Sequence, residues 1–375
     1  MKKNQTPVYV RGGYVTQFGE LYEQGLLDLL VEAAHASLSQ AAMEVSALDA
    51  IYVSNMLGAQ TDNIQHLGAQ LSGILGVSIP AFRFEAACAS GGVAASSAYR
   101  DVSGGHYNNV LVLGGEKMTE QSPQMVNSGL MQATTQDEQM SGITFAGLYA
   151  LLAAHYLDTY TLERNILSWV PLLMHRNGAT NPKAQFQKLI TLKQIEAARA
   201  VTYPFRLFDC SPLSDGAAAI IISSEPSSVR MIGSAIATDS PDIGSRQDLL
   251  SFNATKQAFQ NLDLSPDWHK NLVALEAHDC FSIALIIAVE DLGLAQPGYG
   301  WKLVQNLYTN PEKYPWTLNQ SGGLKAAGHP VGATGIKQIV SVYQQLQSAK
   351  KNSLGLTHNL GGTGGTAVIN AFTSC

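Results

Sequence analysis

The sequence predicts an α/β fold, and three observations support this prediction. Short apolar, β-like runs alternate along the chain with longer helical patterns. The chain has 375 residues, of which 46% are hydrophobic, so it is long enough to bury one large core or two ordinary ones. Its 34 glycines fall in clusters, which is typical of tight turns and close backbone approaches.

The expected elements follow in order along the chain. Strands are expected over Val8–Arg11, Ala50–Val53, Ala81–Glu85, Val110–Leu113, Ala217–Ile222, Val229–Ala237, Leu272–Glu276, Gly355–His358 and Ala367–Ala371. Helices are expected over Leu26–Leu38, Gln65–Leu75, Gly91–Val102, Leu249–Leu262, Ser282–Leu292 and Thr334–Leu346. Residues 118–205 differ, because they are rich in Gln, Met and Thr and contain no convincing strand. Amphipathic patterns at Phe145–Tyr160 and Ile195–Ala200 predict a mostly helical insertion there.

The chain contains a faint internal repeat of glycine pairs around a helix and a strand. The order Gly91-Gly92, helix, strand, Gly114-Gly115 returns as Gly322-Gly323, helix, strand, Gly361-Gly362. The pattern breaks near Ser223-Ser224-Glu225-Pro226. We therefore predict two similar halves, with residues 1–117 and 206–225 forming the first, 226–375 the second, and 118–205 inserted in the first.

Composition excludes several classes of protein. Lys and Arg total 23 against 29 Asp and Glu, and no basic run occurs, so we expect no nucleic-acid partner. The apolar stretches are too short and interrupted to span a membrane. Met1–Gln5 leads into a strand-like segment rather than the apolar core of a signal peptide. Four cysteines without a C-x-x-C spacing predict neither a zinc site nor a disulfide framework, and favour a cytoplasmic setting.

A single cysteine, Cys88, stands among small residues where a strand gives way to a helix, in Glu85-Ala86-Ala87-Cys88-Ala89-Ser90-Gly91-Gly92. The amino end of a helix favours the nucleophilic thiolate, and small neighbours leave room for a substrate carbonyl. The alternative is a buried cysteine in a tight turn, which is the commoner role of a lone cysteine.

A histidine, His329, stands between Gly328 and Pro330 in a glycine-rich loop before a helix. Such a loop would hold an imidazole that accepts the Cys88 proton and later binds a thioester oxygen. The alternative, an incidental exposed histidine in a glycine-rich connection, is about as well supported by this motif alone.

Two further blocks follow predicted strands. In Glu276-Ala277-His278-Asp279-Cys280-Phe281-Ser282, the groups suit acid–base chemistry, or Asp279 or Ser282 caps the next helix. In His358-Asn359-Leu360-Gly361-Gly362-Thr363-Gly364-Gly365, glycines can turn a backbone N–H toward an oxyanion, or they form a plain hairpin.

In this order, the four blocks resemble the thiolase family, and most closely the sterol-carrier-protein-type thiolases with their His-Asp-Cys-Phe block. The resemblance extends over nearly the whole chain and includes Ser214-Asp215-Gly216-Ala217-Ala218. It implies a five-layered αβαβα fold of two similar halves with an inserted loop domain. It also implies acyl transfer between coenzyme A thioesters by an acetyl-CoA C-acyltransferase or C-acetyltransferase of lipid metabolism. No resident cofactor or metal is expected, coenzyme A being a substrate, and the assembly is expected to be a homodimer or homotetramer.

The resemblance also assigns roles to residues. Cys88 takes the nucleophile position, and His329 activates it. His278 stands where many thiolases have an asparagine, so His278 and His329 form the first oxyanion hole. Cys280 takes over the acid–base role, because Asn359 stands where the usual second cysteine would be and is left to support the site. The N–H groups of Gly361 and Cys88 form the second oxyanion hole. Ser211 falls near a position that contacts the pantetheine arm of coenzyme A.

Two other functions stay open at this point. A decarboxylating ketoacyl synthase shares the fold, but it needs no second catalytic cysteine such as Cys280. A non-catalytic thiolase-like partner that binds acyl-CoA would not need all four reactive positions to be filled.

Overall fold

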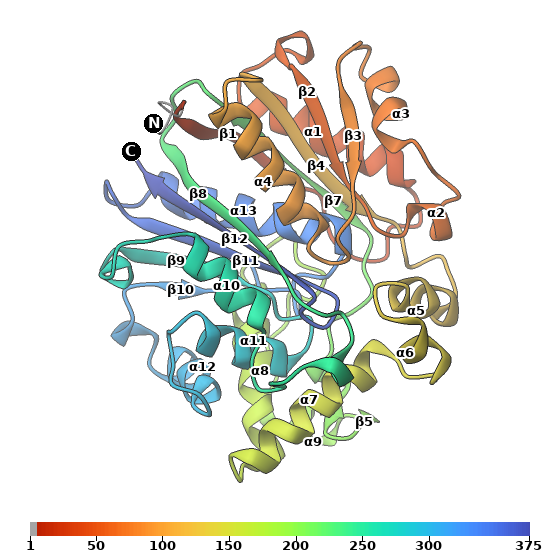
Figure 1. Cartoon of the computed structure of the whole chain (residues 1–375), viewed down its shortest axis with the longest axis vertical. Coiled ribbons are helices and arrows are strands. Elements are labelled where there is room, and N and C mark those ends of the chain that lie inside the picture. Colours follow the sequence, from red (N-terminus) through yellow and green to blue (C-terminus); the bar gives the residue numbers. More distant parts are fainter. Residues whose placement is uncertain (1–5) are drawn as a thin grey trace.

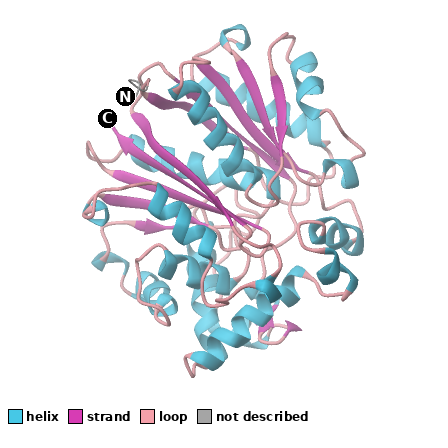
Figure 2. Ribbon diagram, viewed as in Figure 1, coloured by secondary structure: helices cyan, strands magenta, loops and turns pink. Residues whose placement is uncertain are grey.

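The computed structural model describes residues 6–375, so the prediction made for Met1–Gln5 lies outside the described residues. A ten-stranded sheet runs through the molecule in the order β10-β9-β11-β12-β8-β1-β7-β4-β2-β3. Helices cover it on its outer faces and also lie between its two halves (Figures 1 and 2).

Both halves of the sheet have the same strand order. The first half consists of β1 (Val8–Val15), β2 (Ala50–Ser54), β3 (Ala81–Phe84), β4 (Asn109–Glu116) and β7 (Gly216–Ser223). The second half consists of β8 (Val229–Thr238), β9 (Leu272–Ala277), β10 (Thr317–Leu318), β11 (Leu354–Gly361) and β12 (Thr366–Ser374). The order β3-β2-β4-β7-β1 is matched by β10-β9-β11-β12-β8. The two halves meet where β1 pairs with β8 over Val8–Val10.

The two halves enclose a central pair of helices. These are α4 (Ser90–Ser103) and α13 (Thr334–Gln347), which contact each other and strands of both halves. Their apolar side chains share one core with inward-facing residues such as Val112 and Ile220. The neighbouring residues Leu111 and Ile221 point to the outer face, as the twofold alternation of a strand requires.

The outer layers complete a five-layered arrangement. On the first half, α1 (Leu26–Gln40) and α3 (Leu67–Ile74) cover the sheet, and the short helix α2 (Gly58–Thr61) follows β2. On the second half, the outer helices are α10 (Asn253–Asn261), α11 (Ser282–Asp291) and α12 (Gly300–Thr309). The fold class predicted from the sequence is therefore confirmed.

The segment between β4 and β7 is mostly helical. It contains α5 (Pro123–Met131), α6 (Gln136–Met140), α7 (Phe145–Thr159), α8 (Trp169–Gly178) and α9 (Leu192–Ala197). In Figure 1, α7, α8 and α9 lie at the bottom of the molecule, and α5 and α6 lie at its right side. The prediction of no strand in this segment is wrong, because β5 (Ala200–Thr202) and β6 (Phe205–Arg206) pair with each other. Ala200 therefore belongs to a strand and not to the predicted helix Ile195–Ala200, since α9 ends at Ala197.

The other predicted elements match observed ones, with small differences at the ends. The strand β1 continues four residues beyond the predicted end, to Val15. Another difference at a strand end concerns the glycine-rich block after His358. Residues Asn359–Gly361, predicted as part of a loop, are the last residues of β11. Among residues 6–375, no helix is both long and apolar enough to cross a bilayer.

Candidate active site

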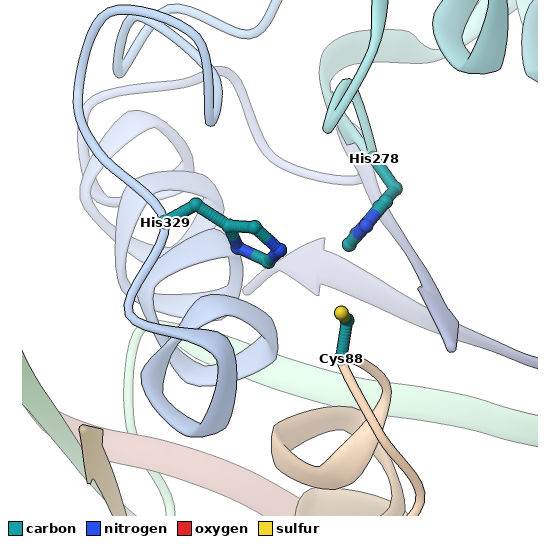
Figure 3. A group of neighbouring side chains, drawn as sticks. All are labelled: Cys88, His278 and His329. Carbon is teal, nitrogen blue, oxygen red and sulfur yellow. The ribbon is translucent and has the colours of Figure 1, made fainter. Parts of the chain in front are cut away.

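Three side chains from distant parts of the chain converge at one point (Figure 3). The sulfur of Cys88 and one nitrogen each of His278 and His329 all lie within 4.8 Å of one another. Cys88 lies in the turn between β3 and α4, His278 directly follows β9, and His329 lies in the loop before α13. β2, β3 and β4 are mutually parallel, and so are β9, β10 and β11, which brings their carboxyl ends to the centre of the molecule.

The turn that carries Cys88 is tightly held. Ala87 adopts a left-handed backbone conformation with φ of 52°, which is uncommon for alanine. The Ser90 hydroxyl accepts the Ala86 N–H and donates to the Ala87 carbonyl. The alternative role of Cys88, a cysteine that merely fills a turn, does not account for the two imidazoles that face its sulfur (Figure 3).

The Cys88 thiol is protonated at rest. Burial raises its pKa to about 12, although a hydrogen bond from the Gly362 N–H partly opposes this effect. Backbone N–H groups do favour the thiolate, but desolvation of the charged form outweighs them. Cys88 consequently needs a base.

His329 is arranged as that base. Its Nδ1 lies 2.7 Å from the Thr334 hydroxyl, which itself donates to the Pro330 carbonyl. Because that hydroxyl has only one proton, it accepts from Nδ1–H, so Nε2 is left without a proton. Burial, with a smaller contribution from the Lys337 charge, lowers the pKa of His329 to about 3. His329 is buried, so the alternative of an incidental exposed histidine is wrong.

The backbone around His329 is fixed from the first half. The Ser214 hydroxyl accepts the His329 N–H at 2.9 Å. Gly328, with φ of +110°, brings the chain so close that a Cβ there would lie 2.8 Å from the same hydroxyl. The Ser214-Asp215-Gly216 block of the first half thus positions the loop of the second half that carries His329.

His278 has the opposite tautomer. Its Nδ1 accepts a hydrogen bond from Nδ2 of Asn359 at 3.4 Å, so its proton is on Nε2. That Nε2–H is buried and has no hydrogen-bond partner within the described part of the chain. Burial, followed by the nearby His329, lowers the pKa of His278 well below its usual value. His278 therefore presents a neutral N–H donor, as an oxyanion hole requires.

Asn359 holds the site together. Its Oδ1 accepts the Gly92 N–H of α4, which fixes the orientation of the amide. Its Nδ2 then donates to the Cys88 carbonyl at 2.9 Å as well as to His278. A metal ion on Nε2 of His278 would require the ring proton to be on Nδ1. That Nδ1–H would then face the Asn359 N–H, so two donors would oppose each other. The Cys88, His278 and His329 group is close enough to hold a metal ion, but its hydrogen bonding suits a proton donor better.

Cys280 lies beside Cys88. It is buried, and burial together with the neighbouring Cys88 raises its pKa well above the usual value. The hydroxyl of Tyr149 from α7 partly opposes this rise in the pKa of Cys280. Both residues line the cavity that contains Cys88.

Asp279 has a structural task that the sequence did not indicate. Its carboxylate accepts the N–H groups of Leu324 and Lys325, in the loop that leads to His329. The Ser282 hydroxyl donates to Asp209, and no side chain caps α11. The alternative in which Asp279 or Ser282 caps this helix is therefore wrong.

The glycine turn between β11 and β12 is a hairpin that also reaches the site. The N–H of Gly362, a residue with φ of +61°, acts on the Cys88 thiol and lowers its pKa. A Cβ on Gly361 would lie 2.4 Å from the Ala86 carbonyl, so Gly361 allows the hairpin to approach the Cys88 turn. Its role in an oxyanion hole stays a prediction.

A cavity of about 320 Å³ leads to Cys88. Its apolar wall includes Met56, Leu130 and Phe145. Ser211 lines it too, with its N–H bonded to the Cys280 carbonyl, so the predicted contact of Ser211 with coenzyme A stays a prediction with a suitable location. Arg199 is the one Lys or Arg among the described lining residues of this cavity.

Comparisons with known proteins give a consistent result. Family models match residues 8–203, described as "Thiolase, N-terminal domain", and residues 235–373, described as "Thiolase C-terminal domain-like". An acetyl-CoA acetyltransferase of Methanothermobacter thermautotrophicus is 37% identical, over 98% of this chain and 99% of the relative. Sterol carrier protein 2 of Gallus gallus is 30% identical, over 98% of this chain and 72% of the relative.

Solved structures share the fold at low sequence identity. Acat5 thiolase from Ascaris suum in complex with coenzyme A has a TM-score of 0.76 and 17% identity, over 98% of this chain and 100% of that one. Human mitochondrial 3-ketoacyl-CoA thiolase has a TM-score of 0.74 and 19% identity, over 100% of both chains.

Proposed function

The chain belongs to the thiolase family, and we propose that it transfers acyl groups between coenzyme A thioesters through an acyl intermediate on Cys88. The convergence of Cys88, His278 and His329 within 4.8 Å carries this proposal. Acetyl-CoA is the proposed acyl donor or product, because the chain resembles acetyl-CoA acetyltransferases over nearly its whole length.

In the thiolytic direction, Cys88 attacks the 3-keto carbonyl of a 3-ketoacyl-CoA. Its proton moves to Nε2 of His329, the ring nitrogen that Thr334 leaves unprotonated. The bond between the α- and β-carbons then breaks. The acyl group stays on the sulfur of Cys88, and the electron pair of the broken bond stays on the α-carbon, which gives the enolate of acetyl-CoA.

That enolate needs strong stabilisation, because the α-proton of a thioester is far less acidic than a thiol. The Nε2–H of His278, buried without a partner within residues 6–375, is the donor that we assign to the thioester oxygen. His329, protonated in the first step, supplies a second donor. Cys280 then gives its proton to the α-carbon, and coenzyme A removes the acyl group from Cys88.

In the condensing direction, the same groups act in reverse. Cys280 removes the α-proton of acetyl-CoA, and the enolate attacks the acyl group on Cys88. A decarboxylating synthase would need no such base, so the buried Cys280 thiol beside Cys88 favours a thiolase over that alternative.

Intact-mass spectrometry after mixing with acetyl-CoA tests this function. We expect one acetyl group on the wild-type chain and none on a Cys88→Ala variant. Cys280→Ser should still be acetylated but should exchange the α-protons of acetyl-CoA with solvent much more slowly. An acetyl group on Cys88→Ala, or normal exchange by Cys280→Ser, would contradict the assigned roles. Turnover with malonyl thioesters but not with acetyl thioesters would favour the decarboxylating synthase.

A homodimeric or homotetrameric assembly in the cytoplasm is part of the same proposal. The edge strand β3 carries an exposed Phe82, which supports a further contact at that edge. The four cysteines are all free, which fits a reducing compartment. Light scattering of the purified chain would give the number of copies.

A further inference from the structure

We propose that Asn319 is a positioning residue whose side-chain amide fixes the imidazoles of His278 and His329 relative to each other. This inference rests on the proposed function and deepens it, because it assigns the alignment of the two histidines to a residue that does not line the cavity. Asn319 lies outside the sequence blocks that pointed to the site, and its side chain is fully buried.

Asn319 continues the pairing of β10 with β9 after β10 itself has ended. Thr317 and Leu318 pair in parallel with β9, and the Asn319 N–H donates to the Leu275 carbonyl at 2.8 Å. Asn319 then turns the chain away in a left-handed conformation with φ of 49°, which asparagine adopts more readily than most residues. Its side chain takes the place of the next peptide group. Oδ1 accepts the Ala277 N–H at 2.6 Å, and Nδ2 donates to the Ala277 carbonyl at 2.9 Å.

The same amide also bonds the residue on the other side of His278. Nδ2 of Asn319 donates to Oδ1 of Asp279 at 3.0 Å. The amide has one orientation, because an N–H group faces its oxygen and two acceptors face its nitrogen. One side chain therefore holds both chain neighbours of His278, whose ring lies beside the Cys88 sulfur (Figure 3).

Asp279 extends this constraint to the loop that carries His329. Its carboxylate accepts the N–H groups of Leu324 at 2.7 Å and Lys325 at 3.1 Å. It is buried, and no Lys or Arg within residues 6–375 forms an ion pair with it, so its charge depends on these N–H groups and on the Asn319 amide. Asn319 thus fixes the Asp279 carboxylate, and that carboxylate fixes the loop.

The two imidazoles need this precision because they act on the same atoms. Their ring centroids lie 5.3 Å apart, with the rings nearly perpendicular. In the proposed mechanism His278 and His329 both donate to one thioester oxygen, and His329 also takes the Cys88 proton. Small displacements of such groups cost large factors in rate.

The test begins with Asn319→Gly, which removes the amide and still accepts the left-handed φ without strain. Single-turnover acylation by acetyl-CoA, followed by quenched intact-mass spectrometry, gives two quantities. The final acetylated fraction reports how many chains are folded, and we expect it to stay near the wild-type value. The maximal rate constant should fall about tenfold or more, and α-proton exchange of acetyl-CoA in D₂O should fall by a similar factor. The acetyl-CoA concentration that gives half the maximal rate should change less than about twofold, since Asn319 is outside the cavity.

Asn319→Asp separates hydrogen bonding from the filling of space. The aspartate has the same shape and keeps an acceptor for the Ala277 N–H, but it places a second acceptor against the Ala277 carbonyl and Asp279. We expect a loss of rate of about tenfold or more here too. A wild-type rate in Asn319→Asp together with a slow Asn319→Gly would mean that the side chain only fills space, and would overturn the proposal.

Asn352→Gly is the matched control. Asn352 also has a left-handed backbone, with φ of 65°, but it is exposed and lies in the turn before β11. It should change neither the rate constant nor the acetylated fraction. A wild-type rate in Asn319→Gly, or a loss of acetylated fraction instead of rate in both Asn319 variants, would also overturn the proposal. A wild-type chain that takes up no acetyl group would instead contradict the proposed function.

Discussion

At the scale of single residues, burial sets the protonation of the site. It keeps Cys88 a thiol and His329 an uncharged base, with pKa values of about 12 and about 3. One contact with a hydroxyl and one with an amide then decide which ring nitrogen of each imidazole has the proton. Thr334 leaves Nε2 of His329 free to accept, and Asn359 leaves Nε2 of His278 to donate. Two histidines thus take opposite roles within one cluster.

These pKa values predict an acylation rate that hardly depends on pH. Between about pH 6 and 9, Cys88 stays protonated and His329 stays neutral, so proton transfer within the pair supplies the thiolate at every pH. Single-turnover acylation by acetyl-CoA, followed by quenched intact-mass spectrometry, should therefore vary less than about twofold over this range.

The His329→Ala variant provides the contrast. Without the base, acylation depends on the thiolate fraction of Cys88, which rises about tenfold per pH unit below the pKa of the thiol. We expect that slope in the variant. A wild-type rate with the same slope would show that His329 does not take the proton.

The residues of the site differ in how far the sequence predicted them. Cys88, His278, Cys280 and His329 stand in motifs, so they could be chosen from the sequence. Tyr149 could not, because an aromatic residue on an amphipathic helix is indistinguishable from core, and its partner Gly362 lies 213 residues away. The action of the Gly362 N–H on the Cys88 thiol could not be predicted either, since it depends on the left-handed turn of the hairpin.

At the scale of elements, the site depends on how closely α4 and α13 approach. Gly91 and Gly92 lie in the first turn of α4, Gly335 lies in the first turn of α13, and Gly332 lies in the short turn just before α13. A Cβ on Gly91 would lie 3.0 Å from the Gly332 carbonyl and 3.0 Å from the Gly335 N–H. Gly91, Gly332 and Gly335 therefore form a close contact between the two halves, near the point where Cys88 and His329 are brought together.

This contact predicts that Gly91→Ala destabilises the fold. The added methyl group meets backbone atoms that cannot rotate away, so we expect a loss of about 1–3 kcal/mol in the free energy of unfolding. Chemical denaturation followed by circular dichroism measures it. Acylation of Cys88 should fall as well, since the two helices would move apart.

Gly73→Ala is the control for this prediction. Gly73 lies in α3, and a Cβ there would meet no atom within 4 Å. Alanine favours a helix over glycine, so we expect an equal or higher stability, by up to about 1 kcal/mol. If both variants were equally stable, the close approach of α4 and α13 would not limit the fold.

The elements themselves were largely predictable where they are buried. Strands such as β4 and β7 form apolar runs with both faces covered, and that pattern is evident in the sequence. The pair β5 and β6 is short and bonded only to itself, so no periodicity marks it. The pairing of β1 with β8, which joins the halves, involves residues far apart in the chain and was not predictable from local pattern.

At the scale of the whole molecule, the cavity lies where the inserted segment meets both halves. Its lining includes Leu130, Phe145 and Arg199 from the insertion, Cys88 from the first half, and Val331 from the second. A ligand bound there contacts all three parts. Coenzyme A carries several phosphate charges, and Arg199 is an exposed cation on this lining.

We therefore predict that Arg199 contributes to coenzyme A binding. Arg199→Ala should raise the KM for coenzyme A several-fold, by about 3- to 10-fold for one exposed ion pair, with little change in kcat. Saturating coenzyme A should also raise the midpoint of thermal unfolding less in this variant, because ligand stabilisation follows affinity. Arg230→Ala, at an exposed position on β8 outside the cavity, should change neither quantity.

If Arg199→Ala kept the wild-type KM and thermal shift, the phosphates would have to be bound elsewhere, and the cavity would hold only the acyl and pantetheine parts. The effect should weaken as salt is added, since an exposed cation is screened, whereas the acylation of Cys88 in its buried site should not.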